Sequence, residues 1–103
     1  MADFTKILQQ AQQMQGRLQQ IQEELGNMTV TGVSGGGMVS VTADGKGQVR
    51  SVKLDPSVVN PADVEMLEDL IAVAVADAQK KATDLAQEEM RKLTGGLPLK
   101  LPF

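Results

Sequence analysis

The chain has 103 residues, with ten Lys and Arg against thirteen Asp and Glu, which gives a net charge of −3. It contains no Cys, His, Trp or Tyr, so it lacks the thiol and imidazole groups that commonly serve as nucleophiles, general bases and metal ligands. A chain of this length fits one domain and leaves little room for an internal ligand cavity. We therefore expect a protein that is not an enzyme and has no cofactor, no metal and no small-molecule substrate.

No segment of the sequence predicts export or insertion into a membrane. The N-terminal residues lack the apolar stretch of a secretory signal. The longest apolar run, 70–76, is far shorter than the ~20 residues that span a bilayer. The absence of Cys is compatible with a reducing compartment. We expect a cytoplasmic protein with no membrane partner.

The first predicted element is a helix over residues 3–27. Its apolar residues form two series with a spacing of seven, a pattern typical of a helix that packs one seam against another helix. Eight Gln make the remaining surface polar but nearly uncharged. Gly26 and Asn27 favour the end of the helix. The seam consists of Phe4, Ile7, Ala11, Met14, Leu18, Ile21, Leu25 and Met28.

After this helix the apolar period changes to two, which predicts strands over 28–33, 38–43 and 48–54. The glycines of segment 44–47 favour a hairpin turn between the second and third strands, because glycine accepts positive φ. Val49 and Val52 lie three residues apart and break the alternation. This spacing predicts either a β-bulge or a strand buried on both faces.

The last predicted element is a helix over residues 61–93. Asn60, Pro61 and Asp63 favour a helix start, because they supply a cap, a proline at the first helical position and an acid in the first turn. The small Ala residues of its apolar stripe would let another backbone approach closely. We expect the tail, 98–103, to be mobile. The stripe consists of Ile71, Val75, Ala78, Ala82, Ala86, Met90 and Leu93.

These elements predict an α+β fold, an α-β-β-β-α protomer with a three-stranded antiparallel sheet and two long helices, within one domain over residues 1–97. At 1.5 Å per residue the helices would be about 37 and 50 Å long. A compact domain of 100 residues has a radius of gyration of only about 13 Å. Both helices must therefore overhang the sheet with their apolar stripes exposed. A second copy of the chain is the simplest cover, so we expect a homodimer.

Two groups of residues suggest ligand sites but have simpler explanations. The glycines of 35–37 and 45–47 lack the spacing and the following helix of a phosphate-binding loop. Asp63, Glu65, Glu68 and Asp69 could hold a divalent metal, yet they occupy the first turns of a helix, where the helix dipole already favours acids. We interpret both groups as structural.

The basic residues of the two helices have two explanations. Cations near a helix C-terminus complement the helix dipole. In a dimer each cation also appears twice, so paired helical arms could contact a phosphate backbone. With no Trp or Tyr to stack on unpaired bases, duplex DNA would be the better nucleic-acid substrate. These cations are Lys6, Arg17, Lys80, Lys81, Arg91 and Lys92.

Several short segments have a distinctive order and spacing. They are QAQQMQ at 10–15, GGGMVSV at 35–41, GKG at 45–47, LDP at 54–56, MLEDLI at 66–71, DA at 77–78 and KLTGGL at 92–97. On these segments, over about residues 4–97, the chain resembles the YbaB/EbfC family of bacterial nucleoid-associated proteins.

The resemblance implies a nucleoid-associated, tweezer-like homodimer that binds duplex DNA with low sequence specificity and has no enzymatic activity. It also implies a role in chromosome organisation, gene regulation or recombination and repair. The alternative hypothesis is a protein-binding adaptor or holdase-like helical clamp with no role on DNA. The resemblance places the DNA contacts on the first and last helices, at Lys6, Gln9, Gln13, Arg17, Lys80, Lys81, Arg91 and Lys92.

Overall fold

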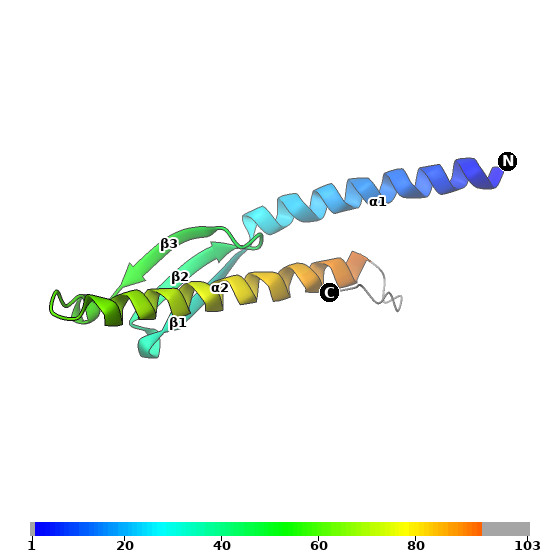
Figure 1. Ribbon diagram of the computed structural model, residues 1–103. Coiled ribbons are helices and arrows are strands. Elements are labelled where there is room, and N and C mark those ends of the chain that lie inside the picture. The colour runs from blue at the N-terminus through cyan, green and yellow to red at the C-terminus, as the bar shows by residue number, and fades with distance from the viewer. Residues whose placement is uncertain (1, 94–103) are drawn as a thin grey trace.

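The computed structural model describes residues 2–93, and the predicted mobile tail, 98–103, lies outside them. The order of the elements confirms the predicted α-β-β-β-α fold. A three-stranded sheet carries one helix across its face, and a second helix extends away from its end (Figure 1). The elements are α1 (Ala2–Asn27), β1 (Thr29–Ser34), η1 (Gly35–Gly37), β2 (Val39–Asp44), β3 (Val49–Leu54), η2 (Pro56–Val58) and α2 (Val64–Leu93).

The sheet is antiparallel with the strand order β1-β2-β3. Each strand begins one residue later than predicted, because the preceding residue closes a turn. The amide of Met28 donates to Leu25 O, the amide of Met38 donates to Gly35 O, and Gln48 O accepts from the amide of Asp44.

A β-bulge interrupts the pairing of β2 with β3. Thr42 pairs with Ser51, whereas Ala43 pairs with Val49, so one residue of β3 has no partner. The predicted bulge is confirmed. The alternative, burial of both faces of β3, is wrong: its inward-facing valines are 39% and 44% exposed.

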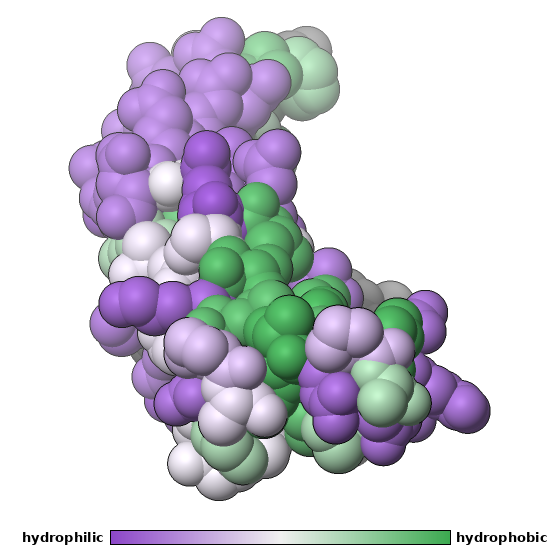
Figure 2. All heavy atoms as spheres, turned by 90° about the vertical axis from the view of Figure 1, so that its left-hand side faces the viewer, coloured by the Kyte–Doolittle hydropathy of each residue, from purple (hydrophilic) through white to green (hydrophobic). Residues whose placement is uncertain are grey.

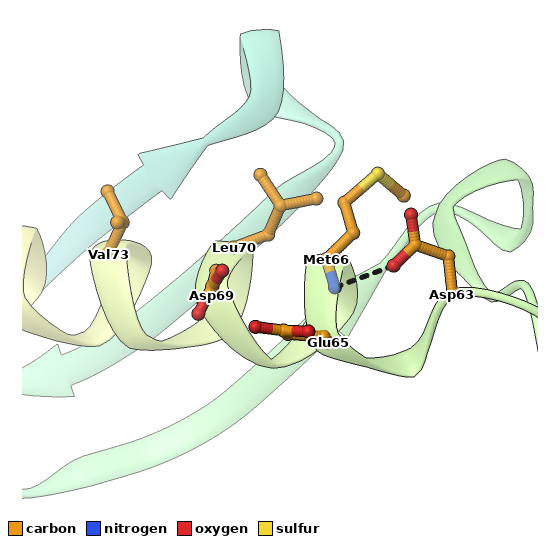
Figure 3. A pocket seen from close by; sticks show the side chains of 6 residues that line it. All are labelled: Asp63, Glu65, Met66, Asp69, Leu70 and Val73. Carbon is orange, nitrogen blue, oxygen red and sulfur yellow. Dashed lines mark hydrogen bonds between the residues drawn. The ribbon is translucent and has the colours of Figure 1, made fainter.

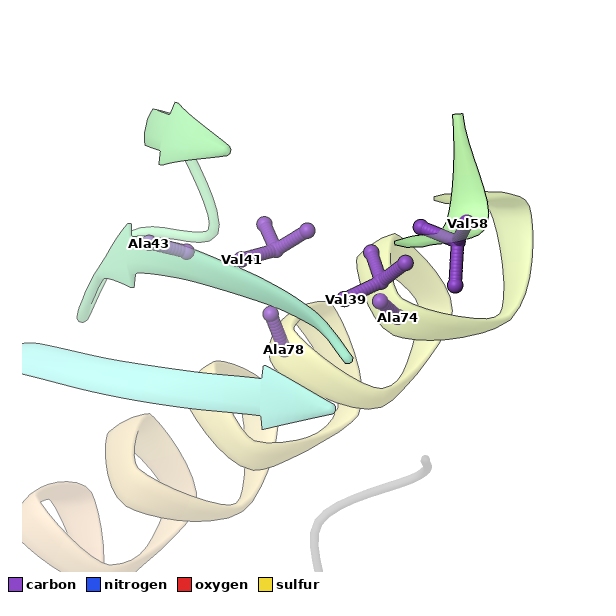
Figure 4. Close-up of a cluster of buried hydrophobic side chains, with 6 residues drawn as sticks. All are labelled: Val39, Val41, Ala43, Val58, Ala74 and Ala78. Atoms are coloured by element: carbon purple, nitrogen blue, oxygen red, sulfur yellow. The ribbon is translucent and has the colours of Figure 1, made fainter. Parts of the chain in front are cut away.

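The hydrophobic core lies between α2 and the first two strands. Val39, Val41 and Ala43 of β2 are fully buried against the Ala residues of α2 (Figure 4). Val58 of η2 closes one end of this core. Most of the contacts of α2 with the sheet are with β1 and β2. The core is therefore thin and is built from small side chains.

Gly32 explains how closely β1 approaches α2. A Cβ at this position would collide with backbone atoms of Ala74 and Ala78. The predicted role of the small residues on α2 is thus confirmed, and the backbone that they admit is that of β1 in the same chain. Only glycine and alanine leave room for this approach.

The start of α2 differs from the prediction. The helix begins at Val64, three residues later than expected, and Asp63 is its cap, because its Oδ1 accepts from the amide of Met66 at 3.1 Å. Asn60 instead accepts from the amide of Ala62 and closes a turn. Both residue types cap helices well, so the sequence alone favoured the cap that came first in the chain.

Helix α1 is fixed to the sheet only at its C-terminal end. Leu25 is buried, and its carbonyl accepts from the amide of Gly45 in the β2–β3 hairpin at 2.8 Å. Every described side chain from residue 3 to 17 is exposed. The molecule consequently extends 73 Å in its longest dimension, with a radius of gyration of 19.4 Å. Neither helix, within residues 2–93, is long and apolar enough to cross a membrane.

Replacement of Gly32 by Ala should destabilise the protein strongly. The added Cβ would meet the backbone of α2, which cannot rotate away as a side chain can, so we expect a loss on the order of 3 kcal/mol. Gly16→Ala is the matched control, because open space surrounds Gly16 and Ala favours the helix by about 1 kcal/mol. Chemical denaturation measures both changes. Equal stability of the Gly32→Ala variant and the unmodified protein would contradict the packing of β1 against α2.

Candidate nucleic-acid interface

Four of the predicted contact residues share one face of α1. Lys6, Gln9, Gln13 and Arg17 follow one another at intervals of three or four residues, which places them along one side of a helix. All four are exposed, and they lie on the part of α1 that extends beyond the sheet. This face lies beside the apolar seam, roughly a third of a turn around the same helix. The structure thus presents a polar and cationic strip to solvent.

The four predicted contact residues of α2 are distributed over two faces. Lys80 and Arg91 are three turns apart and share one face, whereas Lys81 and Lys92 share another. Each of the four forms an ion pair with a carboxylate of α2. The pairs are Lys80–Asp84 at 3.3 Å, Lys81–Asp77 at 3.1 Å, Arg91–Glu88 at 2.6 Å and Lys92–Glu89 at 3.3 Å.

Lys81 has a structural role at the edge of the sheet. Its Nζ donates to the carbonyl of Thr31 at 2.9 Å, and its partner Asp77 accepts from the amide of Val33 at 3.0 Å. These side chains of α2 therefore satisfy the outward-facing backbone groups of β1. The Val33 amide, and then the Lys81 ammonium, hold the pKa of Asp77 below its ordinary value. Lys81 is for this reason less available to a phosphate than its position on α2 suggested.

Among the described residues Asp44 is the one charged residue that is buried, with 1% of its surface exposed. Burial by itself raises the pKa of this carboxyl. The amides of Gln48 and Lys46 and the guanidinium of Arg50 outweigh that effect and hold the pKa below its ordinary value. Arg50 Nη2 lies 2.8 Å from Asp44 Oδ2. This ion pair links the end of β2 to the bulged residue of β3.

Among the described residues, four cations take part in none of the ion pairs: Lys6, Arg17, Lys46 and Lys53. Two of them belong to the predicted site on α1, whereas Lys46 lies in the turn between β2 and β3 and Lys53 lies near the other end of β3. The sequence shows an excess of positive charge over residues 29–54. It does not show which cations are neutralised, because that depends on which carboxylates lie within reach in the fold.

A shallow hollow of about 380 Å³ lies beside the start of α2. Its lining combines acidic and apolar side chains, and the carboxylate of Asp63 is engaged with the amide of Met66 (Figure 3). Within residues 2–93 no group of three or more acidic side chains is arranged to hold a metal ion. The lining residues are Asp63, Glu65, Met66, Asp69, Leu70 and Val73.

Comparison with known proteins identifies the family. A model of the YbaB/EbfC DNA-binding family matches residues 1–97. The chain belongs to the YbaB/EbfC family. A nucleoid-associated protein of Gemmatimonas aurantiaca is 57% identical to this chain, with 98% of this chain and 99% of the relative covered. Another, of Rhodospirillum rubrum, is 50% identical over the full length of both chains.

A solved structure supports the YbaB/EbfC fold of this chain. The crystal structure of an uncharacterized protein from Helicobacter pylori matches with a TM-score of 0.72 at 26% sequence identity. The match covers 91% of this chain and 95% of that one. The predicted family membership and fold class are therefore confirmed.

The stability of the protein should fall in acid through three aspartates. The pKa values of Asp44, Asp55 and Asp77 lie below the ordinary 3.8 in the folded chain. A depressed pKa contributes stability that is complete above the unfolded-state value and is lost as the pH falls toward the folded-state value. We expect a flat melting temperature from pH 7 to about 5 and a steep fall below about 4.

Asp44→Asn should melt at a lower temperature at pH 7 and show a shallower fall between pH 5 and 3, because the titrating carboxylate has been removed. Melting curves at several pH values measure both effects. An unchanged acid slope in this variant would contradict the assigned role of Asp44.

Proposed function

We propose that this protein binds duplex DNA as a homodimer with low sequence specificity and acts as a nucleoid-associated protein in the cytoplasm. The observation that carries the proposal is the exposed face of α1, where Lys6 and Arg17 are unpaired among the described residues and lie beside Gln9 and Gln13. Lys and Arg bind phosphates through charge, and Gln adds uncharged hydrogen bonds. Membership of a DNA-binding family supports the same function.

Low sequence specificity follows from the kind of contact available. Side chains on one face of a projecting helix reach phosphates without requiring a particular base. The described residues offer one aromatic ring, that of Phe4, so stacking of unpaired bases has little support. We extend the proposed DNA binding to a role in chromosome organisation, gene regulation or recombination and repair. The relatives are named nucleoid-associated proteins, which is in keeping with such a role.

The sheet supports the proposed homodimer, because the inner face of β3 is uncovered. Val49 and Val52 pair with Ala43 and Val41 and therefore lie on the same face of the sheet as the core. Their partners are fully buried, yet they are themselves 39% and 44% exposed. Seen from the end at which α2 begins, hydrophobic residues form a continuous strip between hydrophilic flanks (Figure 2). A second copy placed on β3 would bury Val49 and Val52.

The two edges of the sheet also differ, because the β1 edge is covered and the β3 edge is open. The edge of β1 is occupied by Asp77 and Lys81 of α2. The other edge, β3, has no strand of the described chain beside it. An open edge beside exposed valines favours pairing with another chain. In the proposed dimer two β3 strands meet across the two-fold axis.

Disruption of this surface should separate the dimer. Val52→Asp places a carboxylate in the proposed interface, and we expect the mass in solution at micromolar concentration to fall to that of one chain. Ser51→Asp is the matched control, because Ser51 lies on the same strand but on the opposite face. Sedimentation equilibrium measures both variants. A dimeric Val52→Asp variant, or an unmodified protein that is monomeric, would contradict the proposal.

Removal of the unpaired cations of α1 should weaken DNA binding. For a Lys6→Gln and Arg17→Gln double variant, the slope of log affinity against log salt should decrease by about 0.9 for each phosphate that is no longer neutralised. Gln12→Glu together with Gln19→Glu is the control, since it changes the charge equally but lies off the contact face. Fluorescence anisotropy with duplexes of different sequence measures the slopes. Equal decreases in both variants would contradict a specific role of this face.

The alternative function, a protein-binding clamp, is favoured by one observation. The apolar seam of α1 is exposed along its overhang, and Phe4 and Ile7 are 66% and 60% exposed. Apolar side chains in such a position could hold an unfolded client. Suppressed aggregation of a client, together with no retention of duplex DNA at ~50 mM salt, would favour this function over the first.

A further inference from the structure

We propose that the open face of the sheet, turned away from α2, is a second surface that contacts the phosphate backbone of duplex DNA. The inference rests on the proposed function and extends the DNA interface beyond the two helices. Alternate residues of each strand point to this face, and the strand register brings them into rows. The rows are Val33–Ser40–Lys53 and Thr31–Thr42–Ser51, followed by Thr29–Asp44 beside the bulged Arg50.

The middle row places three hydroxyl groups side by side across the whole sheet. Thr31 pairs with Thr42, and Thr42 pairs with Ser51. Thr31 and Ser51 are exposed and Thr42 is half-buried, so the row faces solvent. Neighbouring strands are about 4.8 Å apart, so the row forms a compact patch of hydroxyl donors. Hydroxyl groups of Ser and Thr are frequent partners of phosphate oxygens.

Cations flank this row on both sides. Lys53 and Arg50 lie on opposite sides of it along β3, three positions and thus about 10 Å apart. Lys53 is exposed and forms none of the ion pairs of the described residues. The Arg50 side chain is 54% exposed even though it pairs with Asp44. The patch therefore has an ammonium group outside these ion pairs at one end and an exposed, ion-paired guanidinium at the other.

Within the three strands this face has no exposed carboxylate, and Asp55, which follows β3, is engaged by the amide of Ser57. Asp44 is the single acid of residues 29–54, and it is buried and paired with Arg50. With Lys46 in the adjacent hairpin, this segment has a net charge of +2 in a chain whose total is −3. An acidic protein that keeps exposed carboxylates off one broad surface leaves that surface open to a polyanion.

The chemistry favours the backbone of duplex DNA over a single strand. The face carries hydroxyl and cationic groups and no aromatic ring on which an unpaired base could stack. If two β3 strands meet in the proposed dimer, the two open faces become one surface. The number of cations and hydroxyl groups then doubles, and both α2 helices lie on the other side.

The decisive variant is Lys53→Gln, which removes one charge and keeps a side chain of similar length. Because each protomer of a dimer would neutralise one phosphate fewer, we expect the slope of log affinity against log salt to decrease by about 1.8. The control is Ala72→Glu, which makes the same change in net charge on exposed α2, at the opposite side of the sheet. It should leave the slope unchanged. Lys53→Arg should retain binding.

A second variant tests the hydroxyl row. Ser51→Glu introduces a carboxylate between Lys53 and Arg50 and should weaken binding more than Lys53→Gln does. Circular dichroism and sedimentation confirm that each variant is folded and has the mass of the unmodified protein. In the DNA-bound protein, amide resonances of Thr42 and Ser51 should shift, whereas that of Ala72 should not.

The outcomes separate this inference from the proposed function. If the unmodified protein does not retain duplex DNA at ~50 mM salt, the proposed function fails and the inference fails with it. If the unmodified protein binds and the α1 variant weakens binding, but Lys53→Gln behaves like Ala72→Glu, the open face is no contact surface and the proposed function stands. A decreased slope in Lys53→Gln with an unchanged control supports the inference.

Discussion

The position of α2 across the sheet is the constraint on which the rest of the structure depends. An α-helix is about 10 Å wide and strands are about 4.8 Å apart, so one helix covers roughly two strands. Gly32 lets the backbone of β1 lie directly against Ala74 and Ala78 and so draws the helix toward β1. The Asp77 and Lys81 side chains hold it there through the edge of the strand. The third strand is left without a cover.

This offset gives the two halves of the sheet different properties. The inner face of β1 is covered by α2, and side chains of α2 occupy its edge. β1 therefore has little free surface that another molecule could contact. β3 presents uncovered valines, an open edge and, on its other face, Lys53 and Ser51. Association through the inner face and contact with a polyanion through the outer face are therefore compatible, because the pleat of the strand separates the two sets of side chains.

A net negative chain can present positive surfaces when its acids are placed away from them. Here many of the acids of α2 are engaged by cations of the same helix, and Asp44 is buried beside Arg50. The cations without such partners among residues 2–93 lie on α1, in the turn between β2 and β3, and near the end of β3. Local charge, more than net charge, thus decides where DNA could approach.

The sequence by itself determined the kinds and order of the elements. Heptad spacing, strand alternation and the glycine-rich turns are local patterns, and each depends on residues that are close in the chain. The spacing of Val49 and Val52 indicated either a bulge or burial of both faces of β3, and only the strand register and the exposure of the valines selected the bulge. The start of α2 was misplaced because Asn60 and Asp63 are equally good caps, and only the path of the chain after η2 selects between them.

The tertiary structure decided which residues were available for function. The sequence identified the candidate cations on both helices, yet it could not show that those of α2 are ion-paired or that Lys81 fastens β1. Nor could it show that Thr31, Thr42 and Ser51 align in one row, since this depends on strand register over distances of many residues. Local patterns follow from short-range geometry, whereas neutralisation and surface composition follow from contacts that only folding creates.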